Sequence, residues 1–271
     1  MLRYHGGKWR LAPWIISHFP SHATYVEPFA GAASVLLHKT RSRGEVLNDL
    51  DQEVVNLFRV LRSHGDRLRR LIELTPFARV EYLNAIKTKN RSFSDLERAR
   101  RLIVRSFMGH GSDSYRIERS SGFRVRFQGS GLSTPANDWM NYPDALAFTI
   151  SRLRGVVIEN LPAVDVIRIY DRSTTLFYCD PPYPISTRSA CSNGRHCYSH
   201  EMTDDQHTHL AYVLHHQVKG MVIISGYRCP LYDRLYSDWT RHDKDALADG
   251  AKKRVESLWI SPSAGLGLFK D

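Results

Sequence analysis

Four consecutive residues, Asp180-Pro181-Pro182-Tyr183, combine a carboxylate, a rigid backbone and an aromatic ring. They directly follow Thr175-Leu176-Phe177-Tyr178-Cys179, an apolar run typical of a strand buried on both faces of a parallel sheet. Prolines lack N–H donors, so the pair predicts a rigid corner outside the sheet's carboxyl edge, where ligands of α/β folds bind. Such a corner offers acceptors to the hydrogens of an amino group and a ring that can stack on a planar base. A purely structural turn is the alternative interpretation.

A second group of residues, near the N-terminus, has the pattern of a nucleoside-binding crevice. Thr24-Tyr25-Val26 predicts a short strand that runs into a turn, Glu27-Pro28-Phe29-Ala30-Gly31. Asp49 lies 22 residues after Glu27, at the end of the next predicted strand, where a carboxylate can accept hydrogen bonds from ribose hydroxyls. Gly31 is the only glycine in the turn, so the fingerprint of a pyrophosphate site is absent and a nucleoside without phosphate fits better. An ordinary strand-to-helix turn is the alternative.

These two groups need a scaffold, and the chain alternates between strand and helix patterns on both sides of a segment of different composition. The alternation predicts an α/β fold with a parallel sheet. Trp139, Trp239 and Trp259 are interpreted as core residues, and Asp204-Asp205 as charges in the first turn of a helix. Helices are expected over residues 9–19, 32–39, 143–153, 163–170 and 204–217 (capped by Thr203), with a long amphipathic helix after Asp49, and strands over residues 24–26, 46–47, 156–158, 175–179, 221–225 and 255–260, the last paired with residues near 239–242.

The chain has 271 residues and a net charge of +10, and most of the charge excess lies in one segment. Residues 87–126 hold eleven basic residues and four acidic ones, an excess of seven. Such a segment favours a polyanionic partner, because each neutralised phosphate releases counterions; a charge that serves solubility alone is the alternative. Its second half, residues 109–131, predicts a hairpin or loop. The candidate contacts to nucleic acid, each of which could equally be a solvated surface charge, are Arg3, Arg91, Arg116, Arg119, Arg124 and Arg126.

The remaining composition predicts a soluble, cytoplasmic protein with reduced thiols. The N-terminal residues lack the apolar core of a signal peptide, and no apolar stretch is long enough to cross a bilayer, so no membrane contact is expected. The four cysteines show no paired C-x-x-C spacing. Cys191, His196, Cys197 and His200 match no common zinc clip, so no metal is expected, and we interpret their loop as one that closes over substrate or DNA.

Taken in order, these motifs resemble those of the Dam-type (D12 class) DNA adenine-N6 methyltransferases over nearly the whole chain. Residues 3–8 are similar to the family's aromatic-x-Gly-Gly-Lys motif, with Tyr4 where some relatives have tryptophan. Residues 26–31 resemble the cofactor loop, and residues 47–49 the acidic end of the next strand. Residues 177–183 resemble the catalytic motif, and residues 252–256 the family's C-terminal basic stretch. Several motifs in the right order are far more specific than any one of them.

The resemblance implies a Rossmann-like S-adenosylmethionine-dependent methyltransferase fold, with a mostly parallel sheet and an antiparallel C-terminal strand. It places the catalytic domain in residues 1–55 and 145–271. Residues 56–144 would form a basic, mainly helical insert with a hairpin, which serves as the target-recognition region and binds DNA.

The resemblance also implies roles for individual residues. Asp180 and the Pro181 carbonyl would accept hydrogen bonds from the adenine amino group, and Tyr183 would stack on the flipped ring. The implied catalytic set is Asp180, Pro181, Pro182 and Tyr183, and the implied S-adenosylmethionine site comprises Tyr4, Lys8, Glu27, Pro28, Phe29, Gly31, Asp49, Asn160, Leu161 and Asp180.

The implied reaction transfers a methyl group from S-adenosylmethionine to N6 of a flipped-out adenine in double-stranded DNA, with S-adenosylhomocysteine as product and no metal. A cytosine-N4 or RNA amino-methyltransferase and a catalytically inactive DNA-binding relative are the alternatives; a protein-glutamine methyltransferase usually has Asn in place of Asp180. We expect a bacterial or phage-encoded monomer, with a restriction endonuclease as a candidate partner in a restriction-modification system. The motifs do not specify the recognition sequence.

Overall fold

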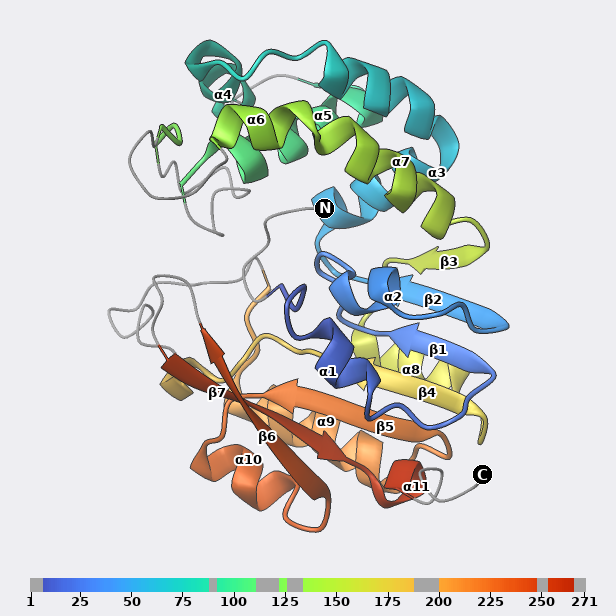
Figure 1. Ribbon diagram of the computed structural model, residues 1–271. Helices are drawn as coiled ribbons and strands as arrows, with labels where there is room; N and C mark the ends of the chain where they lie inside the picture. Colours follow the sequence, from blue (N-terminus) through green and yellow to red (C-terminus); the bar gives the residue numbers. More distant parts are fainter. Residues whose placement is uncertain are drawn as a thin grey trace. The chain divides into compact units, whose positions relative to one another are not determined.

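The computed structural model describes residues 7–87, 92–110, 122–125, 134–187, 200–247 and 253–265, and the chain divides into two compact units (Figure 1). The first unit consists of Met1–Gly7 and Gln52–Arg154, and the second of Lys8–Asp51 and Gly155–Asp271. The predicted assignment of catalysis to residues 1–55 and 145–271, and of DNA recognition to residues 56–144, remains a prediction, because compactness alone assigns no activity.

The second unit is built on a seven-stranded sheet with the strand order β3-β2-β1-β4-β5-β7-β6. Strands β1 to β5 pair in parallel, and β7 runs antiparallel to both β5 and β6. The predicted mostly parallel sheet with an antiparallel C-terminal strand is therefore confirmed. The strands are β1 (Thr24–Glu27), β2 (Gly44–Asn48), β3 (Val156–Glu159), β4 (Thr175–Cys179), β5 (Met221–Gly226), β6 (Thr240–Leu247) and β7 (Lys253–Ile260).

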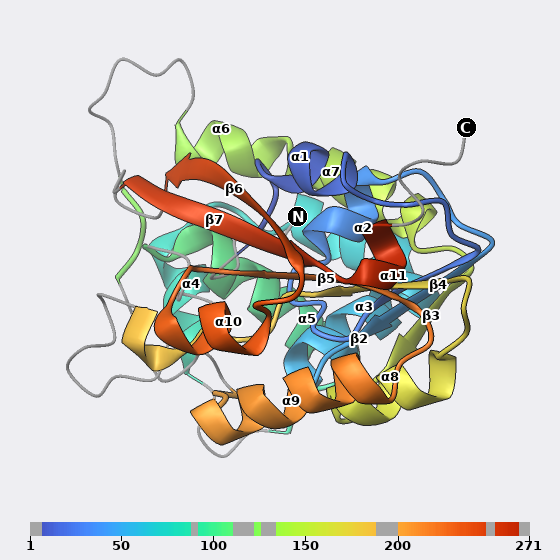
Figure 2. The same cartoon turned by 90° about the horizontal axis from the view of Figure 1, so that it is seen from below.

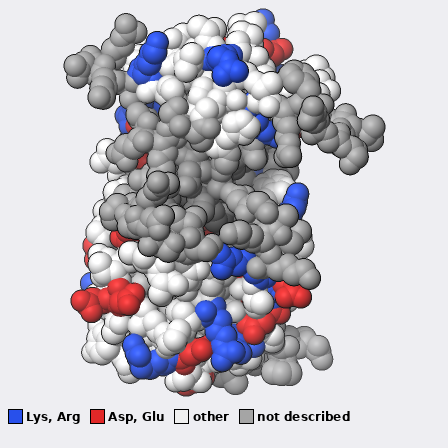
Figure 3. Space-filling view, turned by 90° about the vertical axis from the view of Figure 1, so that its left-hand side faces the viewer, with Lys and Arg blue, Asp and Glu red and all other residues white. Residues whose placement is uncertain are grey.

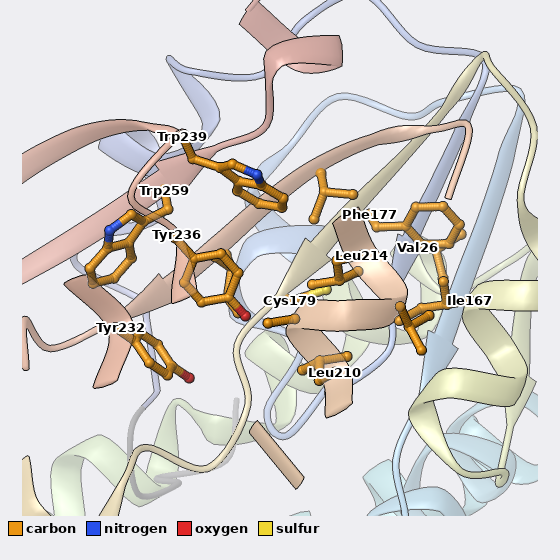
Figure 4. Packing of buried hydrophobic residues seen from close by; sticks show 14 of the residues in the cluster. Val26, Ile167, Phe177, Cys179, Leu210, Leu214, Tyr232, Tyr236, Trp239 and Trp259 are labelled. Carbon is orange, nitrogen blue, oxygen red and sulfur yellow. The ribbon is translucent and has the colours of Figure 1, made fainter. Parts of the chain in front are cut away.

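Helices cover both faces of this sheet (Figure 2), with α8, α9 and α10 on one face and α1, α2 and α11 on the other. The helices are α1 (Ala12–Ile16), α2 (Ser34–His38), α8 (Ala163–Tyr170), α9 (Asp204–His216), α10 (Pro230–Leu235) and α11 (Pro262–Gly265). Apolar side chains of α8, α9 and α10 pack on the sheet in a buried cluster (Figure 4). The labelled members of this cluster are Val26, Ile167, Phe177, Cys179, Leu210, Leu214, Tyr232, Tyr236, Trp239 and Trp259.

Side-chain alternation along the strands decides which residues point away from this cluster. Successive side chains of a strand point to opposite faces, and Val26, Phe177, Ile224 and Trp259 face the cluster. A side chain that is one or three positions away from one of these four residues on the same strand therefore lies on the opposite face of the sheet. Those with polar groups are Tyr25 and Glu27 on β1, Tyr178 on β4, Ser225 on β5 and Glu256 on β7.

The described residues of the first unit form helices, loops and one isolated bridge between Gly109 and Phe123. The helices are α3 (Gln52–Glu73), α4 (Arg79–Ile86), α5 (Asp95–Met108), α6 (Pro135–Met140) and α7 (Tyr142–Arg152). The long helix α3 packs against both α5 and α7, and it contains one non-helical residue, His64. Trp139 is 5% exposed, and its indole N–H donates to the Thr75 carbonyl at 2.7 Å. Its predicted place in a core is thus confirmed, as it is for Trp239 and Trp259.

Two helices of the second unit are shorter than predicted, for local reasons. The helix predicted over residues 9–19 spans only Ala12–Ile16, and the side chains of Ser17 and His18 both lie within hydrogen-bond distance of the Trp14 carbonyl, which a longer helix would use. The helix predicted over residues 32–39 begins at Ser34 because Gly31 and Ala33 have φ of 48° and 51°, a left-handed conformation that belongs to the turn. Helix α9, in contrast, begins where predicted, with a capping box at Thr203 and Asp204 and Asp205 in its first turn.

Candidate active site

The strand order changes direction between β1 and β4, and this point positions the candidate site. From β1 the chain proceeds outward to β2 and β3, whereas β4 lies on the other side of β1 and continues to β5. In an open α/β sheet, a crevice forms at the carboxyl ends of the two strands that flank such a switch point. Glu27 is the last residue of β1, and Asp180 follows the last residue of β4. The two predicted motifs therefore meet at the same edge of the sheet.

One oxygen of Asp180 receives all the hydrogen bonds and ion pairs that reach this carboxylate within the described residues. Ser225 donates to Oδ1 at 2.7 Å, and the hydroxyl of Tyr183 lies 3.1 Å from the same atom. The Nζ atom of Lys8 is 3.0 Å from Oδ1. These contacts hold the carboxylate in place, and it remains accessible to a ligand because the Asp180 side chain is 19% exposed.

Tyr183 connects Asp180 to strand β7. Its hydroxyl also donates to Oε1 of Glu256 on β7, and Glu256 lies 3.6 Å from Nζ of Lys8. The ammonium of Lys8 sits 4.7 Å from the centroid of the Tyr183 ring. Burial and the nearby charge of Asp180 raise the pKa of Glu256 above its usual range. Lys8 thus balances two carboxylates that are close enough to repel each other.

Glu27 is a buried carboxyl with two donors on one oxygen. The hydroxyl of Tyr25 donates to Oε1 at 2.8 Å, and the backbone N–H of Leu36 donates to the same atom at 2.7 Å. Burial nevertheless dominates, and it raises the pKa of Glu27 to about 8, with a smaller contribution from the charge of Asp180. Glu27 can therefore bind or release a proton near neutral pH.

Asp49 closes the turn after β1 from the neighbouring strand. Its two oxygens accept from the backbone N–H groups of Gly31 at 2.7 Å and Asp51 at 2.9 Å. Burial raises the pKa of Asp49 to about 6 despite these bonds. Gly31 has the left-handed φ of 48°, which brings its N–H into reach of the carboxylate. Asp49 remains partly exposed, so it can still accept further hydrogen bonds from a ligand.

Asn48, the last residue of β2, ties together the loops that follow β1 and β3. Its Nδ2 donates to the carbonyl of Pro28 at 2.8 Å and to that of Leu161 at 3.0 Å, and its Oδ1 accepts from the N–H of Leu161 at 2.9 Å. The side chain of Asn160 donates to the Asp49 carbonyl at 2.7 Å. The predicted cofactor residues Pro28, Asp49, Asn160 and Leu161 therefore belong to one hydrogen-bonded group.

The structure brings together most of the predicted site residues that it describes. Contacts or charge–charge interactions join Lys8, Glu27, Asp180 and Tyr183. Hydrogen bonds join Pro28, Gly31, Asp49, Asn160 and Leu161. Phe29 is half-buried against the apolar cluster, Pro181 is buried and Pro182 is half-buried. The predictions for Arg3, Tyr4, Arg91, Arg116, Arg119 and Arg126, and for the loop of Cys191, His196 and Cys197, lie outside the described residues.

The motifs missed four side chains that hold this site together. Asn48, Tyr178 and Glu256 lie within the sequence motifs, but the motifs predict no role for them in the site, and Ser225 lies in no motif. Ser225 had one available signal, because a hydroxyl near the end of an apolar strand is expected to need a partner when it is buried. Tyr178 and Glu256 had none, since their partners lie on other strands.

Part of the basic segment is used inside the first unit. Four of its eleven basic residues lie on α5 and have partners on helices of the same unit. Arg98 pairs with Glu53 on α3, and Arg100 pairs with Glu81 on α4 and with Glu97. Arg101 also pairs with Glu97, and the buried Arg105 donates to the Ala85 carbonyl on α4. Arg124 is 23% exposed and lies 3.7 Å from Asp138. Figure 3 shows one face of the molecule, on which the described Lys and Arg side chains are scattered rather than gathered in one patch. The net charge of the segment therefore overstates what is available to a polyanion.

The described residues lack a metal-ligand cluster and a membrane-spanning helix. Within these ranges, no group of three or more His, Cys, Asp or Glu side chains could hold a metal ion. None of the described helices is long and apolar enough to cross a membrane.

The strand order, the switch point and the acceptor-rich corner define a Rossmann-like enzyme with a methyltransferase fold. More specifically, the model of the D12 class N6 adenine-specific DNA methyltransferases matches residues 4–249, and the chain belongs to this family. It is 25% identical over 269 residues to the DNA adenine methylase of Escherichia coli K12, an alignment that covers 95% of this chain and 92% of that protein. It is also 25% identical over 254 residues to the DNA adenine methylase of Serratia marcescens, covering 89% and 86% of the two chains. The Retron Ec67 DNA adenine methylase of Escherichia coli is 23% identical over 255 residues, covering 89% and 82%.

Proposed function

We propose that this adenine-specific DNA methyltransferase binds S-adenosylmethionine at the carboxyl ends of β1 and β2 and methylates N6 of an adenine flipped out of double-stranded DNA. The observation that carries the proposal is the place of Asp180, a firmly held and partly exposed carboxylate at the switch point beside Glu27. The residues proposed to bind the cofactor are Tyr4, Lys8, Glu27, Pro28, Phe29, Gly31, Asp49, Asn160, Leu161 and Asp180.

The chemistry of the described residues fits this cofactor. Asp49 offers lone pairs to ribose hydroxyls, as an acidic residue at this position of an α/β fold does. Asp49 and Asp180 are carboxylates suited to a ligand that carries positive charge on its sulfonium and ammonium groups. Glu27, with a pKa of about 8, adds negative charge only when it loses its proton. When bound, S-adenosylmethionine supplies the methyl group from its sulfonium.

Asp180 and the carbonyl of Pro181 are proposed to accept the two hydrogens of the adenine amino group. The lone pair of this nitrogen is delocalised into the ring, and two acceptors pull the nitrogen toward tetrahedral geometry, which makes it a better nucleophile. The proline pair keeps the Pro181 carbonyl out of the sheet's hydrogen bonding. Positioning and electrostatics supply most of the rate, without a covalent intermediate.

Tyr183 is proposed to stack on the flipped adenine. Its hydroxyl is anchored by Asp180 and Glu256, which leaves the ring as its contribution to binding. The side chain is 3% exposed and Lys8 covers part of the ring, so stacking requires these covering groups to shift when the base enters. Flipping the base costs a few kcal/mol of unstacking, which contacts to the DNA backbone must offset.

The proposal also covers the region that recognises DNA and the setting in which the enzyme acts. Residues 56–144 are proposed as the target-recognition region, with Arg3, Arg91, Arg116, Arg119, Arg124 and Arg126 as DNA contacts. The enzyme is proposed to act as a cytoplasmic monomer without a metal, to release S-adenosylhomocysteine, and to protect DNA from a restriction endonuclease partner.

The test compares the wild-type protein with Asp180→Ala, using Asp165→Ala as the control. Asp165 is an exposed aspartate on α8 that pairs with Arg168 of its own helix. DNA from expressing cells is sequenced for modified bases, and the purified proteins are assayed with tritiated S-adenosylmethionine. We expect N6-methyladenine with the wild type and with Asp165→Ala, and its loss with Asp180→Ala while circular dichroism shows an intact fold. An active Asp180→Ala protein would overturn the role of Asp180, and N4-methylcytosine would overturn the choice of base.

A further inference from the structure

Asp180 presents its two oxygens to very different surroundings. Oδ1 accepts from Ser225 at 2.7 Å and lies 3.0 Å from Nζ of Lys8 and 3.1 Å from the Tyr183 hydroxyl. Among the described residues, no hydrogen bond or ion pair reaches Oδ2. An ionised carboxylate has about four acceptor positions shared by its two oxygens, so the donors of Ser225 and Lys8 are enough to fill Oδ1. A donor that arrives from a substrate therefore finds Oδ2.

The donor nearest to Oδ1 is Ser225, and the direction of its hydroxyl is set by a second residue. The hydroxyl of Tyr178 donates to Oγ of Ser225 at 3.0 Å. Burial and nearby negative charge raise the pKa of Tyr178 well above its ordinary value, so this hydroxyl remains a donor. With one lone pair of Ser225 engaged by Tyr178, the single Ser225 hydrogen points to Asp180, because the other acceptor within reach, the Cys179 carbonyl, is farther away at 3.4 Å.

The sheet register explains why these three residues meet. Cys179, the last residue of β4, pairs with Ile224 on β5. Asp180 and Ser225, which follow these two residues in the chain, therefore lie side by side. Ser225 is fully buried and Tyr178 is 3% exposed, so neither side chain is placed to contact a ligand in solution. Both lie on rigid parallel strands, which hold a side chain more accurately than a loop does.

We propose that Ser225 is a positioning residue for the reaction: held by Tyr178, its hydroxyl fixes Oδ1 of Asp180 and thereby aims Oδ2 at the amino group of the target base. This inference rests on the proposed role of Asp180 as an acceptor for that amino group. It assigns a function to β5, a strand that carries none of the motif residues. It also gives the Tyr178 hydroxyl a role in the reaction, acting through Ser225.

Four variants separate positioning from simple structural support. Ser225→Ala removes the donor to Asp180 but leaves the buried Tyr178 hydroxyl without its partner, which costs stability. Tyr178→Phe removes only the outer hydroxyl. The double variant Tyr178→Phe/Ser225→Ala removes both polar groups, and such a paired replacement is close to neutral for stability. Ser257→Ala on β7 is the matched control, since Ser257 is a fully buried serine whose hydroxyl has no hydrogen-bond partner among the residues that the structure describes.

The measurements are the kcat and KM of methyl transfer to duplex DNA and the thermal midpoint of unfolding. For Ser225→Ala we expect kcat to fall about ten- to a hundredfold, as for a misplaced reacting group, with nearly unchanged KM for DNA and cofactor and a lower midpoint. For Tyr178→Phe we expect a smaller fall in kcat. The double variant regains the midpoint but not kcat, and Ser257→Ala matches the wild type in both.

Two results would overturn the inference: a wild-type kcat in Ser225→Ala, or a double variant that regains kcat together with the midpoint. The second would show that the loss was one of stability alone. Failure of the proposed function is distinguishable, because the wild-type protein would then transfer no methyl group or Asp180→Ala would remain active.

Discussion

Tyr183 and Glu256 lie 73 residues apart in the chain, and the hydroxyl of the first donates a hydrogen bond to the carboxylate of the second. The same hydroxyl lies 3.1 Å from Oδ1 of Asp180. One hydroxyl hydrogen cannot serve two acceptors at once, so the contact to Glu256 competes with the contact to Asp180. Glu256 is 3% exposed, and it therefore acts as an internal anchor that sets the direction of the Tyr183 ring.

Replacing Glu256 tests this anchor. In Glu256→Ala the Tyr183 hydroxyl and Lys8 both lose an acceptor, and we expect kcat/KM for methyl transfer to fall about tenfold or more, since each hydrogen bond to a charged group contributes about 1.5–3 kcal/mol. Glu256→Gln keeps the size and the acceptor oxygen, so its loss should stay within about threefold. Steady-state kinetics with duplex DNA measure both variants. Equal losses in the two would show that the charge, and not the hydrogen bond, is what matters.

The raised pKa of Glu27 predicts a pH-dependent stability. Its pKa is about 8 in the folded protein against 4.5 for an unperturbed glutamate side chain, so the folded state holds this proton more tightly than the unfolded chain does. The resulting stabilisation is fully present below about pH 4.5 and is lost as the pH rises to about 8. Glu27→Gln stays neutral, and we expect its free energy of unfolding, relative to wild type, to rise by a few kcal/mol across this window.

Urea unfolding at a series of pH values measures this difference, and Asp49→Asn provides a comparison. The pKa of Asp49 is raised from 3.8 to about 6, so its own window should end lower, near pH 6. A Glu27→Gln curve that runs parallel to the wild-type curve from pH 5 to pH 9 would contradict the prediction.

Asn48 should matter for cofactor affinity, because it holds the loops after β1 and β3 in place. Asn48→Ala leaves the carbonyls of Pro28 and Leu161 without this donor, and we expect binding of S-adenosylhomocysteine to weaken about tenfold or more, at about 1 kcal/mol for each lost bond. Isothermal titration calorimetry measures the Kd. Asn56→Ala is the control, since Asn56 is a buried asparagine of the first unit that also donates to a backbone carbonyl. An unchanged Kd in Asn48→Ala would rule out this positioning role.

Gly65 on α3 should be intolerant of alanine, although alanine favours helices by about 1 kcal/mol over glycine. A Cβ at this position would lie 2.7 Å from Cγ1 of Ile150 on α7. We expect Gly65→Ala to lower the free energy of unfolding by about 1–3 kcal/mol through overpacking, as measured by urea denaturation. In an Ile150→Ala background, which removes the atoms that clash, the same change should be neutral or stabilising. A destabilisation that persists there would place the cause in the helix backbone near His64.

Strand and helix patterns predicted most elements of the second unit because their signals are local. The apolar run before Asp180, the turn at Glu27 and the cap at Thr203 are each written in a few adjacent residues. The fold class and the two motifs that meet at the switch point could therefore be predicted. The length of α1 was predicted wrongly although its cause is also local, because apolar spacing takes no account of the side chains of Ser17 and His18, which both reach the Trp14 carbonyl.

By itself the sequence determined which residues are proposed to carry the chemistry, since a carboxylate, two prolines and a tyrosine in a row constrain their own geometry. Only the tertiary structure decided which oxygen of Asp180 the described residues leave open and what holds the other. That choice depends on the register of β4 against β5 and on the position of β7, which bring Ser225 and Glu256 to residues 45 and 73 positions away in the chain. It likewise decided that the arginines of α5 pair within their own unit, because an arginine's partner depends on which helix lies opposite. Hydrogen bonds between strands follow from packing, and packing is a property of the whole fold rather than of any short segment.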